Sequence, residues 1–521
     1  MNQLLTESFR VPAIVTPDHE VSYGEMRKRI QIFAQNAPLK RGCKSILLCE
    51  NREGWIYAFF SIWLQHGIVV PVDAASTVQD LAYVIHDCQA EHIWASASRQ
   101  PIVEQAIGQS GATLAVTYID PLERADIPDS SPEAAIDYEP SDTAVITYTS
   151  GTTGQAKGVM LSFSNLLANG EAVIETLHVD TSTMRSILLL PLHHALPMQA
   201  SLLMPMLAGA GVSLCPSLLG SDIMETLQRS PIGIMVGVPV LWSALIKIMR
   251  SKVYARPLGR PMFQLCRLLH WHWLSRRVFA QVHQLMGQNI HLVSGGAALD
   301  PEVVRDCLAL GLTILEGYGM SETSPVITFT RKGEIRPGSV GRPLRGVDVM
   351  IKEGEICVRG HNIMQGYYGR PAETAALFDD EGWLHTGDEG HFDRQGRLYV
   401  TGRKKEIIVF SNGKNVNPIE IEERLLAHQD IVKEVAVTEK DDVLHAIVIP
   451  TTAWLRTHQG EDQEVALRRE LIKPYNKETA SYKRILAVTL YGGELPRNRM
   501  GKLQRFKLKD LLSANVWANR K

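Results

Sequence analysis

One segment of the chain combines hydroxyl groups, glycines and a single lysine in a pattern suited to binding phosphate. Residues 147–159 read Thr-Tyr-Thr-Ser-Gly-Thr-Thr-Gly-Gln-Ala-Lys-Gly-Val and follow an apolar stretch, Thr143 to Ile146, that we expect to be a strand. Glycine lets the backbone approach an anion, hydroxyls donate hydrogen bonds, and Lys157 adds a mobile charge. Because Gly158 follows Lys157, the segment does not fit the Walker phosphate loop, which disfavours a kinase or ATPase of that type. By composition alone, such a segment is more often a linker, so the rest of the chain must decide.

Composition and length describe a globular enzyme of more than one domain. The 521 residues exceed what a single hydrophobic core usually serves. A formal net charge of -2 gives no global basic bias, so nucleic acid is not an expected partner. Seven scattered cysteines without a C-x-x-C pair indicate a reducing compartment, and the N-terminus lacks the pattern of a signal peptide, so we expect a cytoplasmic protein. Residues 195–221 are uncharged but interrupted by proline and glycine, which predicts a buried helix, a turn and a buried strand instead of a membrane span.

Short apolar strands alternate with amphipathic helical patterns in the first part of the chain, as in a largely parallel sheet covered by helices. We expect strands at residues 45–49, 68–72, 92–95, 232–236, 291–293 and 313–315, and helices at 55–65 and 78–88. From about residue 340 short strands with glycine turns indicate a small antiparallel or barrel-like β unit. Asn417, Pro418 and Glu420 form a helix start, and strands are expected at 435–438 and 445–449, so the tail reads as a small α+β domain.

The segment at 147–159 resembles the signature of the adenylate-forming, AMP-binding superfamily, [YF]-T-S-G-[ST]-T-G-x-P-K-G-V, which includes acyl-CoA synthetases, luciferases and peptide-synthetase adenylation domains. Ala156, where proline is usual, is the departure. The resemblance implies that the loop holds the phosphates of ATP and that Thr152 assists catalysis and binds Mg²⁺. The implied phosphate-binding residues are Thr149, Ser150, Gly151, Thr153, Gly154 and Lys157.

Further segments resemble the same family in the same order. In Pro191-Leu-His-His194, His194 corresponds to the histidine between the acyl pocket and the thiol channel; a buried core histidine is the structural alternative. In Gly317-Tyr-Gly-Met-Ser-Glu-Thr323, the resemblance implies that Glu322 binds Mg²⁺, for which one or two protein carboxylates suffice. The residues implied to surround the adenine and the α-phosphate are Gly295, Gly296, Ala297, Gly317, Tyr318, Gly319 and Thr323.

The last motifs carry the remaining site residues. Asp388, at the end of Trp383-Leu-His-Thr-Gly-Asp, and Arg403 resemble the ribose ligands of the family. In Pro496-Arg-Asn-Arg-Met-Gly-Lys502, the motif implies that Lys502 reaches the active site during adenylation, and Lys405 matches the hinge position. We therefore expect an α/β fold with a large N-terminal AMP-binding domain, residues 1–404, containing parallel and mixed sheets and a barrel-like β unit. A small mobile α+β domain, residues 405–521, follows.

The resemblance implies an ATP-dependent acyl-CoA ligase that forms acyl-AMP, releases pyrophosphate and transfers the acyl group to coenzyme A. Segments such as Leu190-Pro-Leu-His-His and Pro337-Gly-Ser-Val-Gly-Arg-Pro favour the long-chain fatty acid type, and a medium- or long-chain fatty acid is the expected substrate. An acyl-AMP ligase or acyl-carrier-protein synthetase is the alternative, since it shares every adenylation residue. A non-catalytic binding protein is disfavoured because Thr152, Glu322, Asp388 and Lys502 occur together. Chain length, aromatic acids and oligomeric state stay open.

A basic and aromatic stretch raises the prospect of contact with a membrane surface. Between Thr226 and Leu299 there is no Asp or Glu, whereas nine Lys and Arg residues are interleaved with tryptophan, tyrosine and phenylalanine. This pairing suits an anionic lipid surface. A solvated basic face, or attraction of the phosphates of coenzyme A, would give the same pattern. The arginines expected to matter most are Arg256, Arg260, Arg267, Arg276 and Arg277.

Overall fold

The computed structural model describes residues 11–127, 136, 138–150, 156–177, 184–269, 272–287, 290–406, 408–410, 415–497 and 503–513. Gly151, Thr152, Thr153, Gly154 and Lys502 lie outside these ranges. The chain divides into two compact units. The first contains Met1–Met350, Cys357–Thr386 and Phe392–Tyr399, and the second contains Ile351–Ile356, Gly387–His391 and Val400–Lys521.

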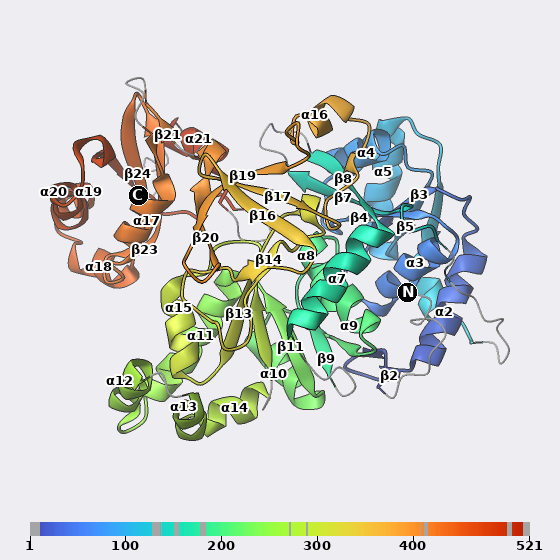
Figure 1. The fold of residues 1–521 in the computed structure, drawn as a ribbon, viewed down its shortest axis with the longest axis horizontal. Helices are drawn as coiled ribbons and strands as arrows, with labels where there is room; N and C mark the ends of the chain where they lie inside the picture. Colours follow the sequence, from blue (N-terminus) through green and yellow to red (C-terminus); the bar gives the residue numbers. More distant parts are fainter. Residues whose placement is uncertain are drawn as a thin grey trace. The chain divides into compact units, whose positions relative to one another are not determined.

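Two twisted sheets organise the described part of the first unit (Figure 1). The seven-stranded sheet has the order β18-β8-β7-β4-β3-β5-β6, and β7-β4-β3-β5-β6 are parallel. Its strands are β3 (Lys44–Leu48), β4 (Ile68–Val72), β5 (His92–Ala95), β6 (Ala115–Tyr118), β7 (Thr143–Ser150), β8 (Ala156–Ser162) and β18 (Gly366–Tyr367). The accompanying helices are α2 (Tyr23–Asn36), α3 (Glu53–Leu64), α4 (Val78–Asp87), α5 (Gln100–Ser110), α6 (Ile119–Glu123), α7 (Phe163–Leu177) and α16 (Pro371–Ala375).

The second sheet has nine strands among the described residues, in the order β15-β14-β13-β12-β11-β9-β10-β1-β2. Strands β13, β12, β11, β9, β10 and β1 are parallel, and the remaining three pair antiparallel. The strands are β1 (Ile14–Val15), β2 (Glu20–Val21), β9 (Arg185–Leu188), β10 (Gly211–Leu214), β11 (Ile232–Gly237), β12 (His291–Ser294), β13 (Thr313–Tyr318), β14 (Thr328–Phe329) and β15 (Arg342–Pro343). Its helices are α10 (Gly220–Arg229), α11 (Pro239–Tyr254), α12 (Gly259–Leu269), α13 (His272–Val278), α14 (Ala280–Met286) and α15 (Pro301–Ala309).

One apolar core joins the two sheets. Helix α3 is apolar on almost every side, and its aromatic residues pack with side chains from β4, β7, β8, β9 and β10. A helix of this kind is stable only when it is enclosed, which places α3 between layers. The uncharged stretch from residue 195 also enters this core: it forms α8 (Ala195–Pro197), the π-helix η3 (Met198–Leu203) and α9 (Met204–Leu207), followed by β10. The expected helix, turn and strand are therefore confirmed, and no helix among the described residues has the length and apolarity needed to cross a bilayer.

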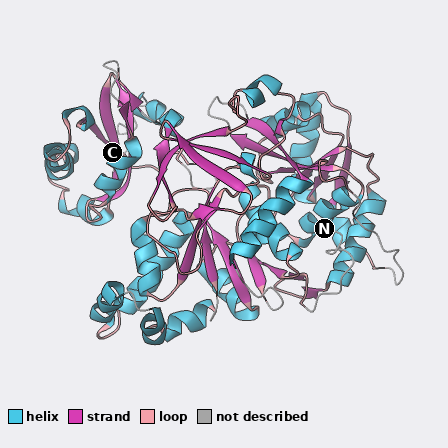
Figure 2. Ribbon diagram, in the orientation of Figure 1, coloured by secondary structure: helices cyan, strands magenta, loops and turns pink. Residues whose placement is uncertain are grey.

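Past residue 346 the described residues form sheets with fewer strands than the first two; all strands are magenta in Figure 2. A four-stranded sheet has the order β16-β17-β19-β20, with β16 (Val347–Lys352), β17 (Glu355–Gly360), β19 (Leu384–Phe392) and β20 (Leu398–Arg403). In the second unit, β21 (Ile408–Val409) pairs with β22 (Asn415–Val416), and β23 (Val432–Lys440), β24 (Val443–Pro450) and β25 (Ile485–Leu490) form a three-stranded sheet. The helices of this unit are α17 (Pro418–Leu426), α18 (Thr452–Thr457), α19 (Gln463–Leu467), α20 (Lys473–Lys477) and α21 (Leu508–Ser513).

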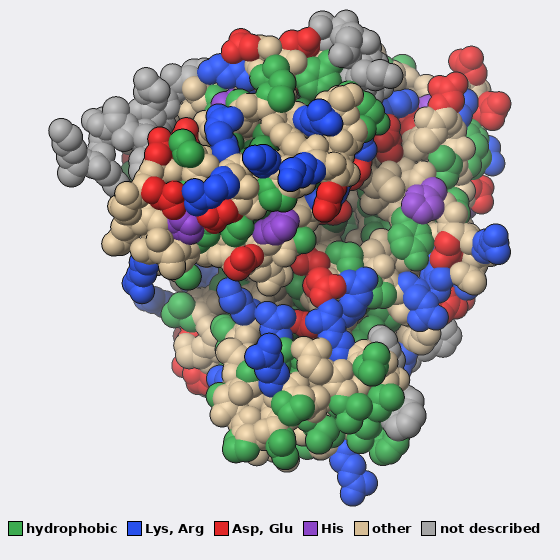
Figure 3. All heavy atoms as spheres, turned by 90° about the vertical axis from the view of Figure 1, so that its left-hand side faces the viewer, with side chains coloured by type: hydrophobic (Ala, Val, Ile, Leu, Met, Phe, Trp, Pro, Cys, Tyr) green, Lys and Arg blue, Asp and Glu red, His purple; other side chains and the backbone are tan. Residues whose placement is uncertain are grey.

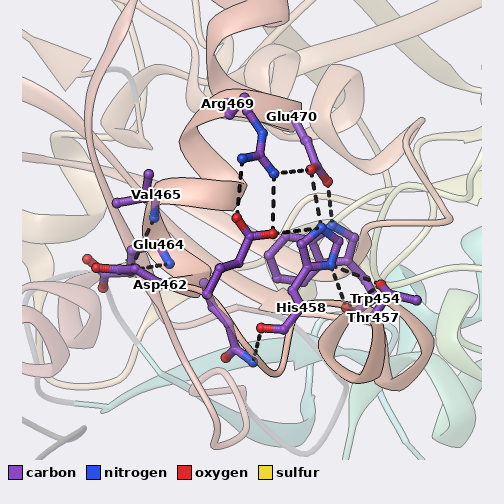
Figure 4. A network of polar contacts seen from close by, with 10 residues as sticks. Trp454, Thr457, His458, Asp462, Glu464, Val465, Arg469 and Glu470 are labelled. Carbon is purple, nitrogen blue, oxygen red and sulfur yellow. Dashed lines mark hydrogen bonds and ion pairs between the residues drawn. The ribbon is translucent and has the colours of Figure 1, made fainter.

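The predicted helix start at Asn417 is confirmed, since its side chain accepts a hydrogen bond from the Ile419 amide at 3.0 Å. Farther along this unit, a polar network closes the corner between α18 and α19 (Figure 4). Glu470 accepts from the Trp454 indole at 2.8 Å, and His458 lies 3.2 Å from the same carboxylate. Hydrogen bonds from Arg469 and then Trp454 lower the pKa of Glu470 to about 2. The network explains how short helices of this unit are held together, and it contains no residue that the sequence marks for chemistry.

Candidate active site

The stem of the hydroxyl-rich loop is a β-hairpin. Strands β7 and β8 pair antiparallel, with Thr149 opposite Lys157 and Ser150 opposite Ala156. The first strand therefore extends four residues beyond the predicted end at Ile146. Because the two strands are paired up to Ser150 and Ala156, they fix where the intervening loop starts and ends.

A polar network that the sequence analysis missed holds this stem. The Tyr83 hydroxyl, on α4, donates to the Ala156 carbonyl at 2.6 Å. The Tyr148 hydroxyl donates to Asp87 Oδ2 at 2.7 Å, and Arg370 Nη2 contacts Asp87 Oδ1 at 2.8 Å. These partners are 61 to 283 residues apart, so no local pattern could reveal them.

The lysine of the loop motif lies beside a buried tyrosine that contacts the predicted metal ligand. Strand β18 pairs with β8, which sets Tyr367 opposite Val159. Lys157 Nζ lies 5.0 Å from the centre of the Tyr367 ring, and the Tyr367 hydroxyl donates to Glu322 Oε1 at 2.8 Å. Burial, and secondarily the Glu322 charge, raises the pKa of Tyr367, so its hydroxyl stays protonated as a donor. Lys157 also forms an ion pair with Glu373 of α16.

Glu322 fits the role of a ligand for a divalent cation. The residue is 7% exposed, and its carboxylate accepts a hydrogen bond from the neutral hydroxyl of Tyr367 but forms no salt bridge among the described residues. A buried carboxylate without a cationic partner is costly unless a positive group is supplied. No cluster of three or more His, Cys, Asp or Glu within the described ranges could hold a metal ion. A single buried carboxylate such as Glu322 suits Mg²⁺, which takes one or two carboxylates and completes its shell with phosphate oxygens and water.

The Thr323 hydroxyl contacts backbone groups of the turn that carries Glu322. The Thr323 hydroxyl lies 2.9 Å from the Met320 carbonyl and 3.1 Å from the Pro325 carbonyl, and it accepts from the Met320 amide at 3.1 Å. Thr323 has no exposed surface, whereas Ser321 of the same 3₁₀ turn is half-buried. Gly319 is required here, because a Cβ would lie 1.8 Å from the Pro325 carbonyl oxygen. The predicted contact of Thr323 with the α-phosphate remains a prediction, and Ser321 offers a more accessible hydroxyl.

The two glycine segments predicted to surround adenine lie at adjacent strand ends. Strands β12 and β13 are parallel, with Ser294 opposite Glu316, so Gly295 and Gly317 follow at the same edge of the sheet. A Cβ on Gly295 would lie 3.0 Å from Leu196 Cδ2. Gly296 has φ +83°, and Ala297 and Gly296 are exposed. The carboxyl edge of a parallel sheet, with small residues that leave the backbone open, is where nucleotides bind in α/β proteins.

Glu316 is a buried acid that the sequence analysis did not single out. It lies on β13 and is 6% exposed, and burial raises the pKa of its carboxyl to about 8. The neighbouring Ser294 hydroxyl is buried without a hydrogen-bond partner among the described residues. The residue type of Glu316 gives no sign of its raised pKa, because the cause is burial in the folded protein and not a neighbouring charge.

His194 directly precedes α8, and the centroid of its ring lies 4.0 Å from that of the His193 ring. Burial, followed by the nearby His193, lowers the pKa of His194 to about 3, and burial lowers that of His193 to about 4. Near pH 7 both rings are therefore neutral, and the 3.6 Å approach of His193 Nε2 to Asp73 is not an ion pair. His194 Nε2 is buried and has no hydrogen-bond partner among the described atoms, so a neutral group entering here could bond to it.

In the second unit the predicted ribose ligands contact each other. Asp388, on β19, and Arg403, at the end of β20, form an ion pair of 2.8 Å between Oδ1 and Nε. The Asp388 side chain is 4% exposed and the Arg403 side chain 37%, so the arginine shields the carboxylate. Lys405 falls in a 3₁₀ turn, Lys404–Glu406, directly after β20. Its predicted role as a hinge, the ribose contacts and the role of Lys502 remain predictions.

Proteins of known activity resemble the chain over most of its length. Malonate–CoA ligase ACSF3 of Homo sapiens is 29% identical over 95% of this chain and 88% of its own length. The 2-succinylbenzoate–CoA ligase of Bacillus velezensis is 27% identical, with 91% and 88% covered. The long-chain-fatty-acid–CoA ligase FadD15 of Mycobacterium bovis is 30% identical, with 79% and 73% covered.

Solved structures share the fold. The ATP-bound RpMatB-BxBclM chimera B1 has a TM-score of 0.81 and 25% identity, with 99% of both chains covered. The o-succinylbenzoate CoA synthetase MenE of Bacillus subtilis, in complex with OSB-AMP, has a TM-score of 0.78 and 24% identity, with 98% of this chain and 97% of that one covered. The expected mixed α/β fold class, a large sheet domain with a small C-terminal domain, is thereby confirmed. The family of AMP-binding enzymes matches residues 6–368, and its C-terminal domain matches residues 405–515. The chain belongs to the AMP-binding enzyme family.

Proposed function

We propose that the protein is an AMP-forming acid–CoA ligase. A carboxylate attacks the α-phosphate of ATP, pyrophosphate leaves, and the resulting acyl-adenylate is attacked by the thiol of coenzyme A, which releases AMP. The observation that carries this proposal is the arrangement of Lys157, Tyr367 and Glu322 beside the hydroxyl-rich hairpin. The Lys157 ammonium lies over the Tyr367 ring, and the Tyr367 hydroxyl donates to the Glu322 carboxylate. Relatives named as CoA ligases, together with an ATP-bound structure at 25% identity, support ATP, Mg²⁺ and coenzyme A as the cofactors.

Charge neutralisation is the main task of the first half-reaction, because a carboxylate and a triphosphate repel each other. Lys157 breaks its ion pair with Glu373 and binds phosphate oxygens of ATP. The Tyr367 hydroxyl keeps the Glu322 carboxylate oriented toward the phosphate site. Glu322 and Thr152 would hold Mg²⁺, which would supply additional positive charge to offset that of the phosphates. Lys502 is the proposed cation on the attacking side.

The nucleoside is proposed to bind at the strand ends. The backbone at Gly295, Gly296, Ala297 and Gly317 faces the adenine, and Tyr318 stacks on it. Ser321 is the better candidate for a hydroxyl near the α-phosphate, because the hydroxyl of Thr323 already serves the turn. Asp388 and Arg403 are the proposed ribose ligands.

His194 is proposed to contact the acyl or thiol substrate. Its low pKa, about 3, keeps the ring neutral, so it serves as a hydrogen-bonding partner and not as a charged group. Leu196, two residues on, lies beside Gly295, and the following segment contributes Met198, Leu202, Leu203 and Met206 to the apolar core. A medium- or long-chain fatty acid is the acid we propose, because the segment that follows His194 is apolar. A cytoplasmic location is likewise proposed, and it is supported by the fact that all seven cysteines are free thiols.

A pyrophosphate-release screen with purified protein tests the proposal. Acids of graded chain length are compared with malonate, 2-succinylbenzoate and 4-coumarate, each with and without coenzyme A. The expected result is acid-dependent pyrophosphate release, highest for the fatty acids, and acyl-CoA formation only with the thiol. Highest release with a dicarboxylate would overturn the proposed substrate. Acyl-adenylate that is transferred to an acyl carrier protein, but not to coenzyme A, would favour the alternative acyl-carrier-protein synthetase.

A further inference from the structure

Helix α12 has two apolar faces, and the described part of the fold buries one of them. The face that packs on the core with α11 and α15 consists of Gly259, Phe263 and Cys266. On another side of the same helix Met262, Leu265 and Leu268 are exposed by 36%, 43% and 76%. Their spacing of three residues aligns them along one stripe of the helix. This exposed stripe is not explained by the stability of the fold.

The residues flanking α12 extend the exposed apolar surface. Leu258, directly before the helix, is 75% exposed, and Trp273, on α13, is 65% exposed. Leu258 has φ +62°, a left-handed conformation that leucine rarely adopts. Gly259 next to it cannot be replaced, because a Cβ would lie 1.9 Å from the Val253 carbonyl oxygen. Figure 3 shows apolar side chains gathered at the lower edge of that view, where α12 lies, with basic side chains beside them.

Two arginines of this basic region form ion pairs within the fold, whereas other basic residues of the region are exposed. Arg250 and Arg267 contact Asp306 of α15 at 2.6 and 3.2 Å, and Arg267 also pairs with Glu302. These two arginines therefore stabilise the packing of α11 and α12 on α15, which corrects the expectation that Arg267 belongs to the external surface. The exposed basic residues that have no carboxylate partner within the described ranges are Lys247, Lys252, Arg256, Arg260 and Arg277.

We infer that the surface formed by Met262, Leu265, Leu268, Trp273 and the exposed basic residues around them docks on an anionic lipid bilayer. The aliphatic side chains and the indole enter the interfacial region, while lysine and arginine contact lipid phosphates. Charge complementarity favours a lipid surface over a protein, because residues 227–299 contain no acidic side chain and a bilayer is uniformly anionic over the same breadth. The inference is independent of the proposed ligase activity, since binding is measured without substrates.

Co-sedimentation of the full chain with vesicles tests it. Vesicles of phosphatidylcholine alone are compared with vesicles that also contain phosphatidylglycerol, at low and high salt. We expect binding to the anionic vesicles only, weakened by salt. A charge variant carries Lys247→Gln, Lys252→Gln, Arg260→Gln and Arg277→Gln, and its binding should fall at least about 100-fold, since each basic residue contributes about fivefold. An apolar variant carries Met262→Gln, Leu265→Gln and Leu268→Gln and should also lose binding.

Matched control variants carry glutamine substitutions at the same number of exposed basic or apolar residues outside the proposed surface. The charge control carries Lys40→Gln, Lys433→Gln, Lys473→Gln and Lys477→Gln, and the apolar control carries Leu219→Gln, Val465→Gln and Leu486→Gln. Both should bind as the parent does. The inference is overturned if the parent does not bind, if controls and surface variants behave alike, or if coenzyme A displaces the protein from vesicles. It is also overturned if the parent is a dimer in solution and the apolar variant a monomer, because a second copy would then cover the surface.

Discussion

The hydroxyl of Tyr367 gives the sharpest test of the candidate site. Tyr367→Phe removes one oxygen atom and keeps the ring that lies under Lys157. The lost hydrogen bond is 2.8 Å long and ends on a buried carboxylate. Hydrogen bonds to charged groups contribute about 1.5–3 kcal/mol, which corresponds to a roughly 10- to 150-fold change in an equilibrium or rate. We therefore expect adenylation to fall at least about tenfold.

The assay is pyrophosphate release with saturating ATP and acid, titrated with Mg²⁺. If the hydroxyl orients Glu322 for the metal, Tyr367→Phe should raise the Mg²⁺ concentration needed for half-maximal rate, an effect that a general loss of stability would not cause. The matched control is Tyr368→Phe, since that hydroxyl donates to Gln89 at 3.3 Å on the surface. It should leave the Mg²⁺ dependence unchanged.

A double-mutant cycle with Glu322→Gln identifies the partner. Adding Tyr367→Phe to Glu322→Gln should cost little more, because the two residues act through one hydrogen bond. The reasoning would be refuted by a Tyr367→Phe variant that folds normally and retains the parent rate and Mg²⁺ dependence. Full additivity of the two substitutions would show that Tyr367 acts on something other than Glu322.

Three further predictions concern other parts of the protein. Glu373→Gln should lower the KM for ATP by about two- to fivefold in steady-state kinetics, because it releases Lys157 from a competing carboxylate; a raised KM would mean that Glu373 helps the nucleotide to bind. Glu316→Gln should flatten the pH dependence of urea unfolding. In the parent, the raised pKa of Glu316 makes the free energy of unfolding fall as the pH rises from about 4.5 to about 8, by an amount on the order of a few kcal/mol. If the variant and the parent had the same pH profile, Glu316 would not be buried as a neutral acid. Lys502→Ala should reduce adenylation by about a hundredfold or more and leave thioester formation from supplied acyl-adenylate intact, as measured in separate half-reaction assays; equal loss in both would exclude a role limited to the first step.

Local patterns were sufficient for much of the fold. Ile68–Val72 has the predicted bounds, because a short apolar run between turn residues has few alternatives to a buried parallel strand. The strand Ile485–Leu490 was missed, since its formation depends on parallel pairing with β24, more than thirty residues earlier in the chain. The extension of β7 to Ser150 likewise comes from its pairing with β8. Strand ends are decided by partners, whereas strand interiors are decided by their own side chains.

For the site, the sequence by itself determined which groups are present: the hydroxyl-rich loop with Lys157, the glycines at 295 and 317, and the acid Glu322. Their chemistry follows from residue type and short-range order, which a linear pattern retains. Only the tertiary structure decided that Tyr367 lies between Lys157 and Glu322, and that Arg267 serves an internal ion pair and not the surface. The Tyr367–Glu322 contact spans 45 residues and exists because β18 adds to the edge of β8. Contacts of this kind arise from strand pairing and helix packing between distant segments, and their energies depend on burial, which no single stretch of sequence specifies.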